Sequence, residues 1–176
     1  SRVAQHFARR YPESTRTVVI DGVVPPQISL GPEIATESQR AVDNILARCA
    51  ADAACSDSFP DIEATFRRVV AELRESPVQV LVPHPNTGRI EEVAFGAGQL
   101  AGAVRLLAYN PNTIALLPLM IHEAGEGNFV PLTSQFMLTA VAMSDSLALG
   151  MHNAIMCTED MPFVDPEKQR AKVPLQ

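Results

Sequence analysis

The sequence predicts a mainly α-helical protein with one small β-hairpin. Apolar residues recur at helical spacing through most of the 176 residues. One pair of short strand-like runs flanks a loop rich in turn-forming residues, which is typical of a hairpin. The 14 prolines outnumber the 9 glycines, so we expect many abrupt helix boundaries and few flexible hinges.

The composition excludes several classes of protein. The formal net charge is −6, whereas a dedicated nucleic-acid binder would carry a basic stripe, so no nucleic-acid partner is expected. No apolar run reaches the length of about 18 residues that suggests a membrane span. A hydrophobic content of 47% is too high for a disordered chain.

The first 20 residues predict a helix followed by a strand. Val3 and Phe7 lie on one face of the helix, and Pro12 ends it because the residue before proline disfavours the helical conformation. The β-branched run Thr17–Ile20 is typical of a strand buried on both faces, as in a parallel sheet. One strand cannot form a sheet, so we expect either that the rest of the sheet lies outside this chain or that the strand pairs with another molecule.

A linker and a series of helices follow. Pro25 and Pro26 predict a stiff, extended linker over residues 24–32 and a domain boundary there. Further on, periodicity and proline positions predict helices over residues 32–51, 60–75, 97–109, 118–123 and 130–149. The hairpin is expected from strands 78–82 and 90–95, and the polar tail 164–176 is expected to be weakly ordered.

The three cysteines allow several interpretations. Cys49 and Cys55 are close enough for a helix end and a short loop to bring them within disulfide reach. They could also be free thiols or belong to a metal site, although a zinc site needs about four ligands and no further ligands are suitably spaced. Cys157 has apolar neighbours, which predicts a buried, inert thiol.

An acidic pair near the end of the chain is the best candidate for binding chemistry. Glu159 and Asp160 precede Met161 and Phe163, and two carboxylates beside apolar residues can hold a substrate ammonium group. The alternative is a solvated loop or a helix N-terminus, which also favours acidic residues. Histidines are expected at the surface, at positions 6, 84, 122 and 152. The sequence contains no complete catalytic set, so neither a metal nor a cofactor is expected.

Both ends of the chain resemble a known family. The runs Ser1–Pro12 and Arg16–Val23 resemble the helix and strand that follow the nucleophile elbow of α/β-hydrolases, most closely the prolyl- and tripeptidyl-aminopeptidase-like group. The resemblance implies a remnant of the hydrolase core over residues 1–27, an inserted helical cap (lid) over residues 28–163, and a tail over residues 164–176. It places the catalytic serine before Ser1, and the acid and histidine after residue 163.

This resemblance implies a function for the parent protein. The chain would be the substrate-selecting cap of a serine hydrolase with aminopeptidase-like activity on peptide, ester or amide substrates. It would be inactive alone, because no triad residue lies within it. Glu159 and Asp160 would bind the substrate's free amino group, with Met161 and Phe163 as an apolar wall.

The resemblance also bears on location and partners. The Cys49 and Cys55 segment resembles a cysteine loop of secreted bacterial members, which implies a secreted or periplasmic protein. The surface that faces the missing core could allow self-association. The alternative function is a stand-alone helical protein-interaction domain without catalysis.

Overall fold

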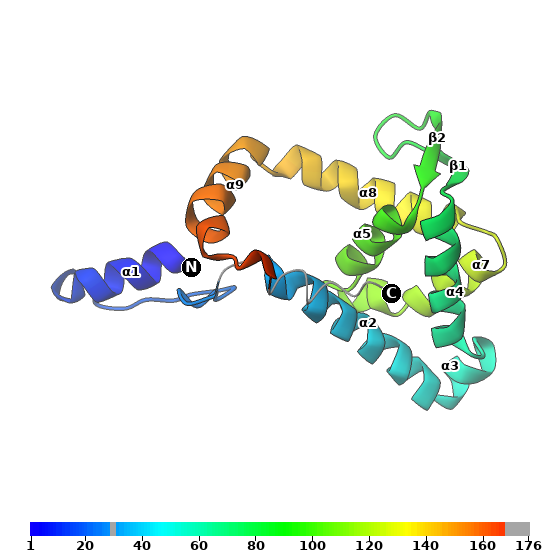
Figure 1. The fold of residues 1–176 in the computed structure, drawn as a ribbon, viewed down its shortest axis with the longest axis horizontal. Coiled ribbons are helices and arrows are strands. Elements are labelled where there is room, and N and C mark those ends of the chain that lie inside the picture. Colours follow the sequence, from blue (N-terminus) through cyan, green and yellow to red (C-terminus); the bar gives the residue numbers. More distant parts are fainter. Residues whose placement is uncertain (29–30, 168–176) are drawn as a thin grey trace. The chain divides into compact units, whose positions relative to one another are not determined.

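The computed structural model describes residues 1–28 and 31–167, and they divide into two compact units (Figure 1). The smaller unit contains residues 1–36 and those from Gly150 onward, and the larger unit is Glu37–Leu149. The elements of the smaller unit are α1 (Arg2–Arg10), the 3₁₀ turn Pro12–Ser14, most of α9 (Leu149–Ile155), the π-helical turn Met156–Asp160 and the 3₁₀ turn Met161–Phe163. The division between the units falls within α2 (Pro32–Ala51) and at the start of α9.

The predicted strand Thr17–Ile20 does not form within the part of the chain that the structure describes. These residues form no strand, and no described residue pairs with them. A strand exists only through hydrogen bonds to a neighbouring strand, so a strong β-propensity is not sufficient. Val19 is 92% exposed and Val18 40% exposed, so the run is apolar without being buried.

The larger unit confirms the prediction of a mainly helical chain with a hairpin. After α2 its elements are α3 (Ala53–Ser58), α4 (Ile62–Glu75), β1 (Val78–Pro83), β2 (Ile90–Phe95), α5 (Ala97–Leu107), α6 (Pro111–Ile114), α7 (Leu117–Gly125) and α8 (Val130–Ser146). The sequence did not predict the short helices α3 and α6. The α4 helix begins two residues after the predicted start at Pro60, because Asp61 adopts a left-handed conformation (φ 51°) before it.

The predicted hairpin is formed by β1 and β2. Its strands are antiparallel, with Val80 opposite Val93 and Leu81 opposite Glu92. Alternation along β1 buries Val80 and Val82 and leaves Leu81 64% exposed. Consequently one face of β1 contributes to the core, and α8 packs against this strand.

A single apolar cluster forms the core of the larger unit. Phe95, at the end of β2, is fully buried, and its ring centre lies 6.2 Å from those of both Phe129 and Phe136. Aromatic pairs at this separation add to the stabilisation from burial. Leu46 of α2, Val69 of α4 and the α5 residues Leu100, Val104 and Leu107 belong to the same cluster.

The contact between α4 and α7 depends on a glycine. A Cβ atom at Gly125 would lie 2.5 Å from Cγ2 of Thr65, closer than atoms can pack. The Arg68 guanidinium donates hydrogen bonds of 3.2 Å to the Gly125 carbonyl oxygen. The two helices therefore approach at a point where no side chain fits, and a charge-assisted bond fixes the approach.

Two histidines differ from the expectation that they lie at the surface. His122 is half-buried, with its ring centre 5.6 Å from that of Phe59. His84 is half-buried in the hairpin loop, and its Nδ1 accepts a hydrogen bond from the Asn86 backbone nitrogen. The ring contact of His122 is a tertiary contact, and the hydrogen bond of His84 lies within the hairpin loop. Helical periodicity in the sequence reveals neither.

Truncation of the central aromatic residue should destabilise the larger unit. We expect Phe95→Ala to lower the free energy of unfolding by about 3–5 kcal/mol, because it removes a buried ring and leaves a cavity. Urea denaturation monitored by circular dichroism measures the change. Leu81→Ala on the exposed side of the hairpin is the control and should change stability by less than about 0.5 kcal/mol. Equal effects of the two substitutions would contradict the assigned core.

Candidate functional site

The smaller unit is held together by polar contacts from the first turn of α1. The Ser1 hydroxyl accepts a hydrogen bond of 3.0 Å from the Val24 backbone nitrogen, and Gln5 donates one of 2.9 Å to the Val24 carbonyl. The Arg2 guanidinium donates to the carbonyl oxygen of Ile28. These bonds fix residues 24–28 along the start of α1. The expected extended linker is wrong here, because the Ile28 backbone nitrogen donates a 3.2 Å hydrogen bond to the Pro25 carbonyl and closes a turn.

Arg2 also forms an ion pair with Asp160, which lies 158 positions away in the sequence. Its Nη2 is 2.8 Å from Asp160 Oδ1. The Asp160 side chain is only 1% exposed and that of Arg2 is 17% exposed, so water is largely excluded from the contact. The hydrogen bond to Asp160 raises the pKa of the Arg2 guanidinium above its ordinary value, desolvation opposes this, and the charges of Asp160 and Glu159 add to the rise.

In the π-helical turn, the side chains of the two predicted acidic residues differ in exposure. Asp160 points inward to Arg2, whereas Glu159 is exposed. Single π-helical turns are rare and occur frequently at functional sites. The neighbouring candidates Met161 and Phe163 are 49% and 74% exposed, on the 3₁₀ turn that follows.

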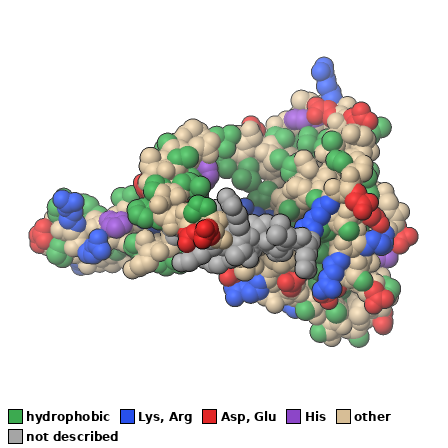
Figure 2. All heavy atoms as spheres, viewed as in Figure 1, with side chains coloured by type: hydrophobic (Ala, Val, Ile, Leu, Met, Phe, Trp, Pro, Cys, Tyr) green, Lys and Arg blue, Asp and Glu red, His purple; other side chains and the backbone are tan. Residues whose placement is uncertain are grey.

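Some of these residues line an open cleft of about 730 Å³, and others do not. Glu159 and Phe163 line it, but Asp160 and Met161 do not. The opposite wall is α1, which contributes His6, Phe7 and Arg10. The space-filling view shows hydrophobic and basic side chains side by side on α1 (Figure 2). The cleft thus offers one carboxylate, cationic groups and aromatic surface to a small polar ligand.

Sequence reasoning missed Arg2 as a member of this site. It was one of several arginines on a polar helix face, and no local spacing links it to an acid so far along the chain. An arginine next to the helix N-cap is one available signal, because a cation is disfavoured at this end of the helix dipole unless an acid compensates it.

A second open groove, of about 670 Å³, lies between α1 and residues 14–18. Its wall contains Val3, Phe7 and Val18 together with Arg16. No acid or histidine lines it, so we assign no reaction chemistry to this groove.

Residues 1–28 and 31–167 contain no group of three or more histidine, cysteine or acidic side chains that could hold a metal ion. Within the same part of the chain, no helix is both long enough and apolar enough to span a membrane.

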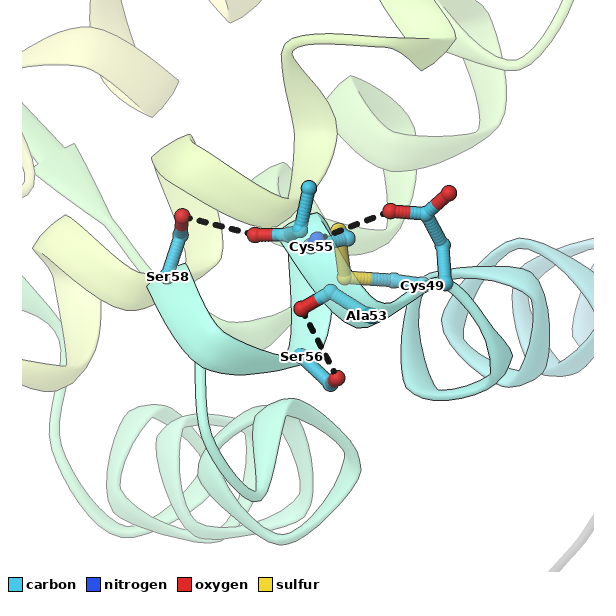
Figure 3. The surroundings of a disulfide bond; sticks show 7 residues. Cys49, Ala53, Cys55, Ser56 and Ser58 are labelled. Carbon is cyan, nitrogen blue, oxygen red and sulfur yellow. Dashed lines mark hydrogen bonds between the residues drawn. A yellow bond between two sulfur atoms is a disulfide. The ribbon is translucent and has the colours of Figure 1, made fainter.

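The Cys49 and Cys55 pair forms a disulfide (Figure 3). Their Cα atoms are 5.1 Å apart, which is within the usual range. The bond joins the last turn of α2 to α3, and Asp52 caps α3 by accepting a 2.9 Å hydrogen bond from the Cys55 backbone nitrogen. The structure therefore brings the two sulfur atoms to disulfide distance, as the disulfide interpretation expects.

The expectation that Cys157 is buried is wrong. It is a free, exposed cysteine in the π-helical turn. Its apolar neighbours in sequence suggested burial, but Ile155 is 43% exposed as well.

The chain has no match among known families or structures. No protein-family model, curated protein or solved structure matches it. The resemblance to α/β-hydrolases therefore stays a prediction from the residues, and the function has to be argued from the site.

Loss of the disulfide should destabilise the α2–α3 junction. We expect reduction with a phosphine to lower the free energy of unfolding by about 2 kcal/mol, because the bond limits the freedom of the unfolded chain over a short loop. Urea denaturation with and without reductant measures the difference. Cys157→Ser, which leaves the bond intact, is the control and should respond to reductant as the wild type does. A reductant-independent midpoint in both proteins would contradict the prediction.

Proposed function

We propose that residues 28–163 form the substrate-selecting cap of a serine hydrolase with an α/β-hydrolase fold, and that residues 1–27 belong to its catalytic core. The observation that carries this proposal is the Arg2–Asp160 ion pair. An inserted domain leaves and re-enters its host at neighbouring points, because chain ends of a domain usually lie close together. Arg2 precedes the proposed insertion in the sequence, and Asp160 lies close to the end of the insertion. Their side chains are in direct contact.

The exposed apolar residues of the smaller unit also support a missing core. Val3 is 83% exposed and Val19 92% exposed, although both lie in segments with strongly apolar faces. Phe7 and Val18, 50% and 40% exposed, line one groove together with Val3. Contiguous apolar surface of this kind marks a place where another part of a protein packs. The sheet of the proposed core would cover these residues and pair with residues 17–20.

The cap's contribution to the reaction is substrate selection. The parent's serine, acid and histidine would carry out acyl transfer, and the cap would exclude water and orient the substrate. Glu159 faces the cleft and is the group we assign to the substrate ammonium, with Phe163 as the apolar wall. Asp160 is already bound to Arg2, so its contribution is to the shape of the site. The substrate class is peptides or related amides and esters with a free amino group.

The disulfide is relevant to location. Disulfides persist in oxidising compartments, so we propose a secreted or periplasmic protein.

The second candidate function is a stand-alone helical interaction domain. The observation that favours it is that the larger unit has its own buried core, centred on Phe95. In that case the exposed apolar residues of α1 would contact a protein partner, or a second copy of the chain.

Reading the coding sequence of the parent protein and labelling that protein with a covalent probe distinguish the hydrolase cap from the stand-alone interaction domain. We expect the coding sequence to contain Gly-x-Ser-x-Gly just before Ser1 and an acid and a histidine after residue 163. A fluorophosphonate probe should label that upstream serine in the full-length product and should not label the 176-residue chain. A start codon immediately before Ser1, or no labelling of the full-length product, would refute the hydrolase proposal.

Substitution of Glu159 tests its assigned role in the full-length protein. Glu159→Gln should lower kcat/KM for aminoacyl arylamides by about tenfold, because one charge contact to the ammonium is lost. Turnover of a simple ester without an amino group should change less than about twofold. Glu13→Gln, an exposed acid outside the cleft, is the matched control. Equal losses on the two substrates would remove Glu159 from amine binding.

A further inference from the structure

Three separate segments of the chain meet at the Arg2 guanidinium. It is carried by the first turn of α1, donates to the Ile28 carbonyl at the end of the Pro25–Ile28 turn, and pairs with Asp160 in the π-helical turn. The neighbouring Ser1 and Gln5 both bond to Val24, just before the Pro25–Ile28 turn. One side chain therefore fixes the π-helical turn against two other parts of the smaller unit.

The exclusion of water makes this contact costly to break. A buried ion pair gains little net stability over apolar residues, because both charges lose their hydration. Removing only one partner is costly, since the other charge is left buried. Such a pair consequently permits one arrangement of its two segments and disfavours others. A preference for one arrangement can hold a neighbouring functional group in a fixed position.

The group that it holds is Glu159. Glu159 and Asp160 are consecutive in the π-helical turn, so fixing one carboxylate inward directs the other outward. Asp160 is 1% exposed, whereas Glu159 is exposed and lines the cleft. The position of Glu159 relative to Phe163 and α1 thus depends on the anchoring of Asp160.

We propose that Arg2 is a positioning residue that sets the orientation of Glu159 through Asp160, and thereby determines selectivity for substrates with a free amino group. This inference rests on the proposed function. Arg2 itself lines the cleft, where its charge repels an ammonium, so loss of that charge alone would lower KM for amine substrates. A rise in KM on its removal therefore reports the fixing of the turn that presents Glu159, and the acyl-transfer chemistry is unaffected.

A double-mutant cycle in the full-length hydrolase tests this coupling. Arg2→Met should raise KM for aminoacyl arylamides by about five- to tenfold and change kcat, and all constants for an amine-free ester, by less than about twofold. In a Glu159→Gln background the same substitution should raise KM by less than about twofold, because residues that act through one contact are not additive. Arg74→Met, at an exposed arginine in the last turn of α4 that lines no part of the cleft, is the matched control and should leave both substrates unaffected.

A second variant keeps the test possible if the first one does not fold. If thermal melting shows that Arg2→Met does not fold, Asp160→Asn takes its place in the cycle, because it keeps the size and a hydrogen-bond acceptor while removing the charge. It should cause the same amine-selective rise in KM, reduced by Glu159→Gln in the same way.

The possible outcomes separate this inference from the proposed function. If the full-length wild type neither reacts with fluorophosphonate nor hydrolyses any substrate, both proposals fail. If the wild type is active but the Arg2 or Asp160 variant loses activity equally on both substrates, the ion pair has a structural role only. Full additivity with Glu159→Gln would likewise refute positioning through that residue, while leaving the hydrolase proposal intact.

Discussion

The smaller unit depends on a buried opposite-charge contact between Arg2 and Asp160. Both charges have lost most of their hydration, so each requires the other to remain where it is. The bonds from Arg2 to Ile28, and from Ser1 and Gln5 to Val24, extend the same constraint along the adjacent segment. Glu159 and Phe163, which line the cleft, lie within three residues of the anchored Asp160.

The two units are stabilised by different kinds of interaction. In the larger unit, apolar burial dominates: Phe95, Leu100 and Leu132 are almost fully inaccessible to water. In the smaller unit, the described apolar side chains of α1 are largely exposed, and polar contacts fix its segments. A unit of the second kind has less independent stability, since hydrophobic burial is the main favourable contribution to folding.

The helices and the hairpin could be predicted because their signals are local. Helical spacing placed Leu100, Val104 and Leu107 on one buried face, and proline marked boundaries near α2 and α7. The disulfide was open to prediction because its cysteines are six positions apart. The strand at Thr17–Ile20, in contrast, needed a partner that local sequence cannot supply.

The candidate site was only partly predictable for the same reason. The acidic pair was visible as a motif, but which acid faces inward depends on Arg2, at the other end of the sequence. The exposure of Cys157 likewise depends on how the π-helical turn is oriented, which apolar neighbours in the sequence do not determine. Local pattern identified the residues, and only long-range contacts assigned them different roles.

The short cysteine loop has a consequence for the order of events during synthesis. Its two thiols can meet by closing a loop of a few residues, which takes well under a microsecond, whereas the core must wait for residues as distant as Leu132. The meeting of the two thiols therefore needs no part of the core, and in an oxidising compartment the time at which the bond forms is set by the oxidant. Once formed, the bond fixes the junction between α2 and α3 whether or not the distant parts of the core have packed.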